Sequence, residues 1–104
     1  MSAPATNIDL AKVKQMIEAC NQGSLHVVQQ LMKENPIYAC QQDETTGRSP
    51  LMAAAAVGNG ALCQYLLETG SAPWNAVDRQ GQCAGNYATD AGHWGVVNLL
   101  VEWG

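Results

Sequence analysis

A run of small residues in the middle of the chain has the spacing and end signals of a short helix. Positions 53–56 are all alanine, a strong helix former that lets a neighbouring helix approach closely. Ser49 can accept a hydrogen bond from the free amides of the first turn, and Pro50 needs no amide partner there. Gly58 can adopt the left-handed conformation that ends a helix. The pattern therefore predicts a helix between Ser49 and Gly58.

A second amphipathic pattern follows directly. Gly70 ends the segment 61–68, whose apolar residues share one helix face: Leu62, Cys63, Leu66 and Leu67. The same arrangement recurs on both sides, because Gly23 precedes Gly58 by 35 residues and Gly92 follows it by 34. One helix pair cannot bury its apolar face alone, so three copies in series predict a stack.

The start of the central unit resembles the ankyrin repeat, whose signature is Thr-Pro-Leu-His-x-Ala with a period of about 33 residues. Its five slots are filled here by Ser49, Pro50, Leu51, Met52 and Ala54. The resemblance implies an all-α ankyrin solenoid of three helix-turn-helix repeats joined by short β-hairpin-like loops. Residues 8–104 are expected to form the ankyrin domain, with repeat one at 8–40, repeat two at 41–76 and repeat three at 77–104.

Turn residues mark the loops and the start of the domain. Residues 43–47 and 78–81 have the composition of hairpin tips, the first with one extra residue. Residues 1–7 are expected to be a flexible leader, and Thr6 or Asn7 is expected to cap a first helix that begins near Asp9. No preceding hairpin limits this helix, so it should be longer than its counterparts.

Composition excludes several classes of partner. The net charge is −4 with five Lys and Arg residues, and no basic cluster exists to neutralise a nucleic-acid backbone. No apolar run approaches the roughly 20 residues of a membrane helix, and the first seven residues do not form a secretory signal. We therefore expect neither nucleic acid nor membrane as a partner.

The four cysteines, Cys20, Cys40, Cys63 and Cys83, are widely spaced and favour reduced thiols over a metal or disulfide framework. Cys20 and Cys63 occupy core slots, and Cys83 replaces the hydroxyl at a helix start. Reduced thiols favour a cytoplasmic or nuclear protein. His93 follows Gly92, where ankyrin repeats often carry a histidine that ties the interhelical turn.

Motifs of enzymes are absent from the sequence. It has no P-loop, no nucleophile elbow and no HExxH, and its glycine-containing pieces do not follow a β-strand. The prediction is a protein that is not an enzyme, with no catalytic, cofactor-binding or metal-binding residues.

The segment 72–93 resembles a more specific family. Its Pro73-to-Asp78 stretch, followed by Cys83-Ala84-Gly85 and Tyr87-Ala88, is similar to the N-terminal ankyrin region of fungal and plant δ-N-type arginine N-methyltransferases. In that family the repeats precede an S-adenosylmethionine-dependent domain, and nothing similar occurs in this chain. The resemblance implies an alternative function, as a regulatory or substrate-guiding module for such a methyltransferase.

Repeat three differs from repeat two at its first helix. Gly85 stands where repeat two has Leu51, so the repeat loses about 1.5–3 kcal/mol of apolar burial. One hypothesis is that the indole of Trp74 packs over Gly85 and Tyr87 and fills this space. The competing hypothesis is that Trp74 is an exposed anchor for a partner.

The preferred function is a protein-interaction module that binds a protein or peptide on the concave face. The resemblance implies that the loop tips and the exposed side of each first helix form this face. The tips mix acids with arginines and favour a basic peptide only slightly. The predicted binding residues are Asn21, Gln22, Glu44, Thr45, Arg48, Ala56, Val57, Val77, Arg79, Gln80, Gln82, Asp90 and Ala91.

Two tryptophans on the last helix predict a second surface. Trp94 and Trp103 are nine residues apart, so their indoles point in different directions and one of them should pack inward. The other would lie on the terminal face, where it favours a homodimer contact or docking to a C-terminal domain.

Overall fold

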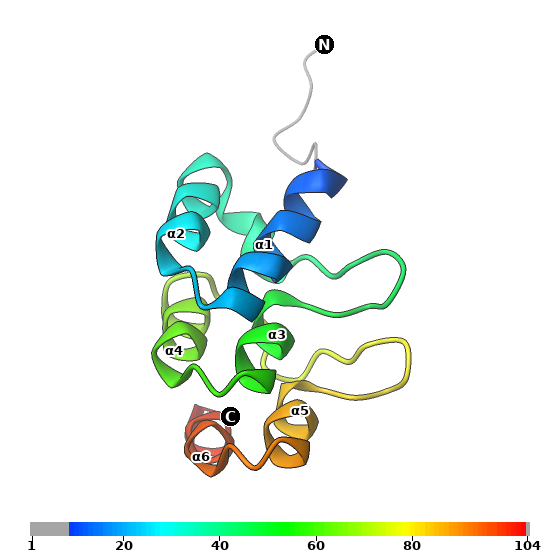
Figure 1. Cartoon of the computed structure of the whole chain (residues 1–104), viewed down its shortest axis with the longest axis vertical. Coiled ribbons are helices and arrows are strands. Elements are labelled where there is room, and N and C mark those ends of the chain that lie inside the picture. Colours follow the sequence, from blue (N-terminus) through cyan, green and yellow to red (C-terminus); the bar gives the residue numbers. More distant parts are fainter. Residues whose placement is uncertain (1–8, 104) are drawn as a thin grey trace.

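Three stacked helix pairs form the molecule in a computed structural model that describes residues 9–103 (Figure 1). Within this range every element is helical. An inner helix and an outer helix make up each pair, and a short 3₁₀ helix, η1, closes the first pair. The elements in chain order are α1 (Leu10–Gln22), α2 (Leu25–Glu34), η1 (Pro36–Cys40), α3 (Pro50–Ala56), α4 (Gly60–Glu68), α5 (Ala84–Asp90) and α6 (Trp94–Trp103).

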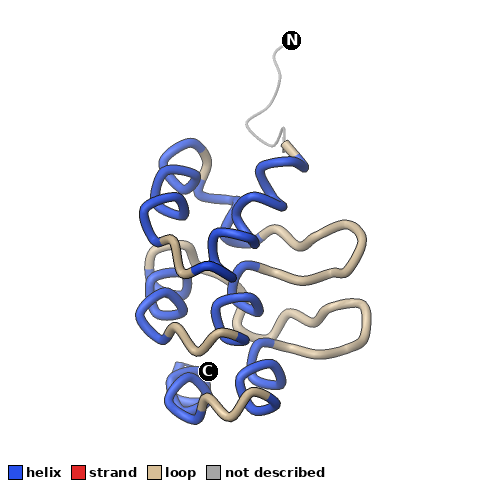
Figure 2. Tube along the Cα trace, viewed as in Figure 1, coloured by secondary structure: helices blue, strands red, loops and turns tan. Residues whose placement is uncertain are grey.

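The helices form two layers, and two long loops extend from the inner one (Figure 2). The inner layer contains α1, α3 and α5, and the outer layer contains α2, α4 and α6. Contacts run from α1 to α3 and from α3 to α5, which makes α3 the middle of the stack. The predicted all-α solenoid with three helix pairs is therefore confirmed.

The residues expected to start and end the central helix do so at α3. The Ser49 hydroxyl accepts a hydrogen bond from the Met52 amide at 3.2 Å, and Pro50 is the first helical residue. Gly58 has φ of 74°, and a Cβ built there would lie 2.5 Å from Nδ1 of His93. His93 thus packs against the turn of the preceding repeat, in agreement with a structural role.

The first helix begins where expected but has a different cap. The Asp9 carboxylate accepts a hydrogen bond from the Ala11 amide at 3.0 Å, so Asp9 is the N-cap of α1. The prediction that Thr6 or Asn7 caps this helix is therefore wrong, and both residues lie outside the described range, as does the leader 1–7. With 13 residues α1 is longer than α3 and α5, which have 7 each, as predicted.

The four cysteines are free in the structure. Cys20 and Cys63 are fully buried, and this burial raises the pKa of each thiol to about 12. Cys83 is the N-cap residue of α5, and its amide donates to the Asn86 side chain at 2.9 Å. The two core thiols are therefore protonated and unreactive near neutral pH.

The packing hypothesis for Trp74 is wrong. A Cβ built on Gly85 would have only the Cys83 sulfur within 4 Å, so the indole does not cover this glycine. Tyr87 instead bonds to Asp78, and Trp74 is 44% exposed. The space beside Gly85 stays open as part of a groove between α5 and α6, which Trp74 also lines.

The expectation that one of the two helix α6 tryptophans packs inward is also wrong. Trp94 is 61% exposed and Trp103 is 42% exposed. Val96 and Leu100 are the residues of α6 that face the core.

Gly70 permits a close contact between the first and second repeats. A Cβ built there would lie 2.6 Å from the Ala39 Cβ and 2.8 Å from the Leu66 carbonyl oxygen. The left-handed residue after α4 is Ser71, with φ of 53°, so Gly70 is required for space rather than for its backbone angles.

We expect Gly70→Ala to lower the free energy of unfolding by about 1–3 kcal/mol, because the new methyl group meets backbone and packed side chain. Gly95→Ala is the matched control, since a Cβ there has nothing within 4 Å and sits in a helix. The control should be neutral or stabilising by up to about 1 kcal/mol. Urea unfolding followed by circular dichroism measures both, and a neutral Gly70→Ala would contradict the close contact.

Candidate functional site

The two long loops form a connected surface. We define the loop face as these two loops together with the exposed ends of the inner helices. Loop one covers residues 41–49 and loop two covers 71–83. The Arg79 amide donates to the Thr46 carbonyl at 3.1 Å, and the Arg79 guanidinium donates to the Glu44 carbonyl at 2.5 Å. The Gln42 side-chain amide bridges the loops by donating to Gly47 and Val77 carbonyls, both at 2.7 Å.

Close approach at Gly47 keeps the loops together. A Cβ built on Gly47 would lie 2.7 Å from the Arg79 amide nitrogen, and its φ is 77°. Any side chain at this position would therefore push the loops apart. The loop face is thus set by backbone contacts between segments far apart in the sequence.

Asp43 shapes the tip of loop one. Its carboxylate accepts from the Thr45 and Thr46 amides at 2.7 and 3.0 Å, and its other oxygen pairs with Lys14 of α1 at 2.9 Å. The pKa of Asp43 is lowered to about 2, chiefly by the hydrogen bond from the Lys14 ammonium and next by the hydrogen bonds from the two amides. The carboxylate stays charged at neutral pH and ties the tip to the first helix.

Asp78 shapes the tip of loop two in the same way. One of its oxygens accepts from the Gln80 and Gln82 amides at 2.8 and 2.9 Å, and the other accepts from the Tyr87 hydroxyl. The Tyr87 hydroxyl is the main cause that lowers the pKa of Asp78. Burial, helped by the nearby carboxylate, raises the pKa of Tyr87.

Arg48 lies over the aromatic ring that Asp78 holds. Its guanidinium carbon is 5.1 Å from the centroid of the Tyr87 ring, a cation–π distance. The Arg48 Nε is buried and has no hydrogen-bond partner. This side chain is therefore braced by Tyr87 and partly enclosed between the loops.

These groups surround a groove of about 370 Å³ between the loops. Four of the predicted binding residues line it: Thr45, Arg48, Arg79 and Gln80. Three lining residues were missed by the sequence reasoning: Thr46, Asp78 and Tyr87. The matched spacing of turn residues indicated the loops, but no local signal indicated that Tyr87 would reach Asp78.

The remaining predicted residues lie around this groove or beyond it. Val57 and Val77 are exposed apolar residues, at 45% and 50%. Glu44, Asp90 and Ala91 are exposed, and Ala56 and Gln82 are partly buried. Asn21 and Gln22 lie at the end of α1, in the first repeat, where Gln22 bonds to Glu18 at 3.0 Å. The structure does not bring these last two into the groove.

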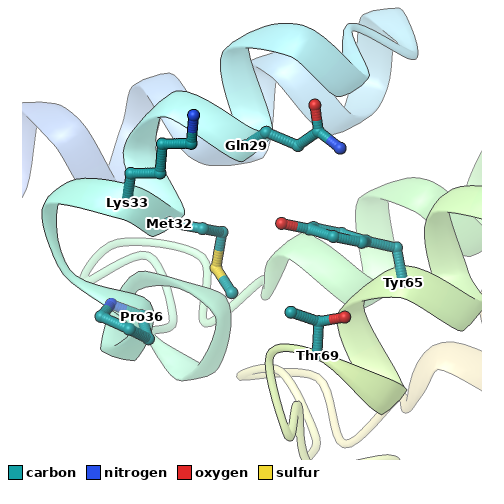
Figure 3. Close-up of a pocket in the computed structure, with 6 residues that line it drawn as sticks. All are labelled: Gln29, Met32, Lys33, Pro36, Tyr65 and Thr69. Atoms are coloured by element: carbon teal, nitrogen blue, oxygen red, sulfur yellow. The ribbon is translucent and has the colours of Figure 1, made fainter.

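A second groove of about 400 Å³ lies on the opposite layer, between α2 and α4 (Figure 3). The Tyr65 ring reaches from α4 toward Met32 and Gln29 of α2, and Thr69 lies beside it. Lys33 and Pro36 complete the lining. This groove has an apolar floor and a polar rim, and none of the predicted binding residues contributes to it.

Residues 9–103 contain no group of three or more His, Cys, Asp or Glu side chains that could hold a metal ion. Over the same residues, no helix combines the length and apolar character needed to cross a bilayer.

The stacked helix pairs with paired loops define a helical repeat protein. A family model described as ankyrin repeats in three copies matches residues 16–104, and the chain belongs to the ankyrin repeat family. The resemblance of Ser49–Ala54 to the ankyrin signature is thereby confirmed.

Relatives with established names align over most of the chain. A 26S proteasome non-ATPase regulatory subunit 10 from Dictyostelium discoideum is 34% identical over 93 residues, which is 89% of this chain and 40% of the relative. A probable E3 ubiquitin-protein ligase, XBOS32, from rice (Oryza sativa subsp. japonica) is 33% identical over 91 residues, which is 88% of this chain and 18% of the relative. The chain thus spans less than half the length of these relatives.

A solved structure has the same fold. The structure of the predatory endopeptidase Bd0816 from Bdellovibrio bacteriovorus in complex with the immunity protein Bd3460 contains a chain that superposes with a TM-score of 0.78 at 32% identity. The match covers 86% of this chain and 45% of that one. The repeat family and this complex support a protein-interaction module.

The finer resemblance of segment 72–93 receives no support from these comparisons. The relatives described above are not named as methyltransferases, and the family match extends only to ankyrin repeats. Ankyrin repeats generally bind other proteins, although one relative is named as a probable ligase. That this chain is not an enzyme stays a prediction.

We expect Tyr87→Phe to raise the pKa of Asp78 toward its ordinary value, because the variant removes the main hydrogen bond to that carboxylate. A lowered pKa means that Asp78 stabilises the fold above its ordinary pKa and that this stabilisation is lost as the pH falls through the folded value. The variant should therefore have a lower urea midpoint at pH 7 and a smaller deficit in acid.

The titration of the Asp78 carboxyl carbon by NMR measures the pKa directly. Tyr65→Phe on the outer layer is the matched control and should leave the Asp78 titration unchanged. An unchanged pKa in Tyr87→Phe would contradict the assigned bond.

Proposed function

We propose that the chain binds a protein or peptide across the loop face, with the groove between the loops as the centre of the contact. The observation that carries the proposal is the groove itself, in which Arg48 lies over Tyr87 and Asp78 holds Tyr87 in place. Arginine and tyrosine are, with tryptophan, the side chains enriched at the energetic centre of interfaces. This surface is the one that the sequence predicts as concave.

The bonds between the loops favour binding. Ordering a mobile loop on association costs free energy, and loops that are already fixed avoid that cost. Gln42 and Arg79 fix the two loops to each other before any partner arrives. Exposed Val57 and Val77 add apolar area on the same layer of the molecule.

Charge at this surface does not select a strongly charged partner. Asp43 and Asp78 already accept hydrogen bonds within the chain, so the slight preference for basic peptides loses part of its basis. Arg79 and Gln80 are exposed at the rim and can donate to a partner's carbonyl or carboxylate oxygens.

The four free thiols fit a reducing compartment, so we propose the cytoplasm or nucleus as the location of this function.

A paired affinity experiment tests the proposal. Val77→Ala with Gln80→Ala removes exposed side chains from the loop face and leaves the bonds between the loops intact, while Gln29→Ala with Lys33→Ala removes exposed side chains from the outer groove. Arg48 is left intact because it packs on Tyr87 and its loss would alter the fold. Proteins captured by the wild type from the source cell are identified by mass spectrometry, and the affinity of each is then measured with purified components.

We expect the loop-face pair to weaken binding of a captured partner at least tenfold, which corresponds to about 1.4 kcal/mol. The outer-groove pair should bind within twofold of the wild type. The opposite outcome, with binding lost only in the outer-groove pair, would move the site to the α2–α4 groove and contradict the proposal.

A further inference from the structure

The groove between the two loops offers hydrogen-bond donors, while its charged acceptor is already engaged. Arg48, Arg79 and Gln80 line it with guanidinium and amide groups. One oxygen of the Asp78 carboxylate accepts from two amides of loop two, and the other accepts from the Tyr87 hydroxyl. That bond also uses the one proton that the Tyr87 hydroxyl can donate. A ligand that brings acceptor atoms is therefore the complementary one.

The Arg48 side chain is the donor that most needs an acceptor. Its Nε is buried and, within the described residues, has no hydrogen-bond partner. The guanidinium lies over the Tyr87 ring through its flat face, whereas the N–H groups of a guanidinium point outward in its plane. Leaving a buried donor without an acceptor costs free energy, and a bound ligand that accepts from this group would recover it.

The charge of the lining fits one negative group. Two arginines and one aspartate are the charged residues that line the groove, so one positive charge there has no counter-charge. The acids of loop one do not supply it. Asp43 is paired with Lys14 of α1, and Glu44 contacts Arg79 through its backbone carbonyl. Because a guanidinium binds a carboxylate through parallel, charge-assisted hydrogen bonds, the groove matches a single carboxylate.

We propose that the groove binds one aspartate or glutamate side chain of a partner peptide, whose carboxylate accepts hydrogen bonds from the Arg48 and Arg79 guanidinium groups. This inference rests on the proposed function, because it names the part of the partner that lies at the centre of the loop face. Asp78 holds Tyr87 under Arg48 and is thus a positioning residue, not a ligand. Gln80 adds an amide donor beside the two arginines.

Selection of short random peptides on the whole folded chain tests the proposal. Selected peptides are synthesised with an amidated C-terminus, so that only side chains can supply a carboxylate. Each acidic residue of a peptide is then replaced in turn, Glu by Gln or Asp by Asn, and the affinity is measured by isothermal titration calorimetry. The Arg48 Nε–Hε signal in NMR spectra reports whether the peptide reaches this side chain.

A pair of protein variants locates the carboxylate. Arg48→Gln removes the guanidinium from the groove, and Lys33→Gln removes the same charge from the outer layer as the matched control. Because Arg48 packs on Tyr87, circular dichroism checks the fold of Arg48→Gln. If that variant does not fold, the NMR signal of the wild type decides the result.

Replacing one acidic residue of the peptide should weaken binding to the wild type and to Lys33→Gln by about tenfold or more, because it removes one half of a charged pair. The same replacement should change binding to Arg48→Gln by less than about twofold, since the pair is already broken there. The acidic peptide should shift the Arg48 Nε–Hε signal, and its neutral counterpart should not.

Two results would overturn this inference and leave the proposed function standing. In the first, peptides bind the loop face equally well after every acidic residue is replaced. In the second, the replacement weakens binding to Arg48→Gln as much as to the wild type, so the carboxylate lies elsewhere. Peptides that bind only at the outer groove, or a library that yields no binder, would overturn both proposals.

Discussion

The close approach of the three inner helices is the constraint on which the rest of the structure depends. Ala53, Ala54 and Ala55 are fully buried in α3, which lies between α1 and α5. Alanine side chains let the backbones on either side come near, and they favour the helix at the same time. A larger residue at these positions would have to push a neighbouring helix away, because well-packed cores do not absorb added volume.

The spacing of the inner helices also sets the spacing of the loops. Each loop leads directly into an inner helix, so stacking α3 on α5 brings loop one beside loop two (Figure 1). The contact at Gly47 and the bonds of Gln42 and Arg79 then hold them together. In this way a groove arises between residues that are about one repeat apart in the sequence.

Local rules were enough to predict the paired helices and the ends of α3. Ser49, Pro50 and Gly58 act through hydrogen bonds and backbone angles within a few residues, and the structure confirms each role. The bond from Tyr87 to Asp78 depends on how loop two folds back on α5, so the sequence did not indicate it. The error at Trp74 has another cause. The volume lost at Gly85 is part of a groove between α5 and α6 that Trp74 lines without filling it, and the indole stays 44% exposed.

The central claim is that α3, which packs with its buried alanines between α1 and α5, is the most stable part of the molecule. Native-state hydrogen exchange measures this residue by residue. The account predicts that amides of α3 exchange most slowly, at the free energy of global unfolding, while α1 and α6 open at lower cost. Faster exchange in α3 than in α1 or α6 would contradict it.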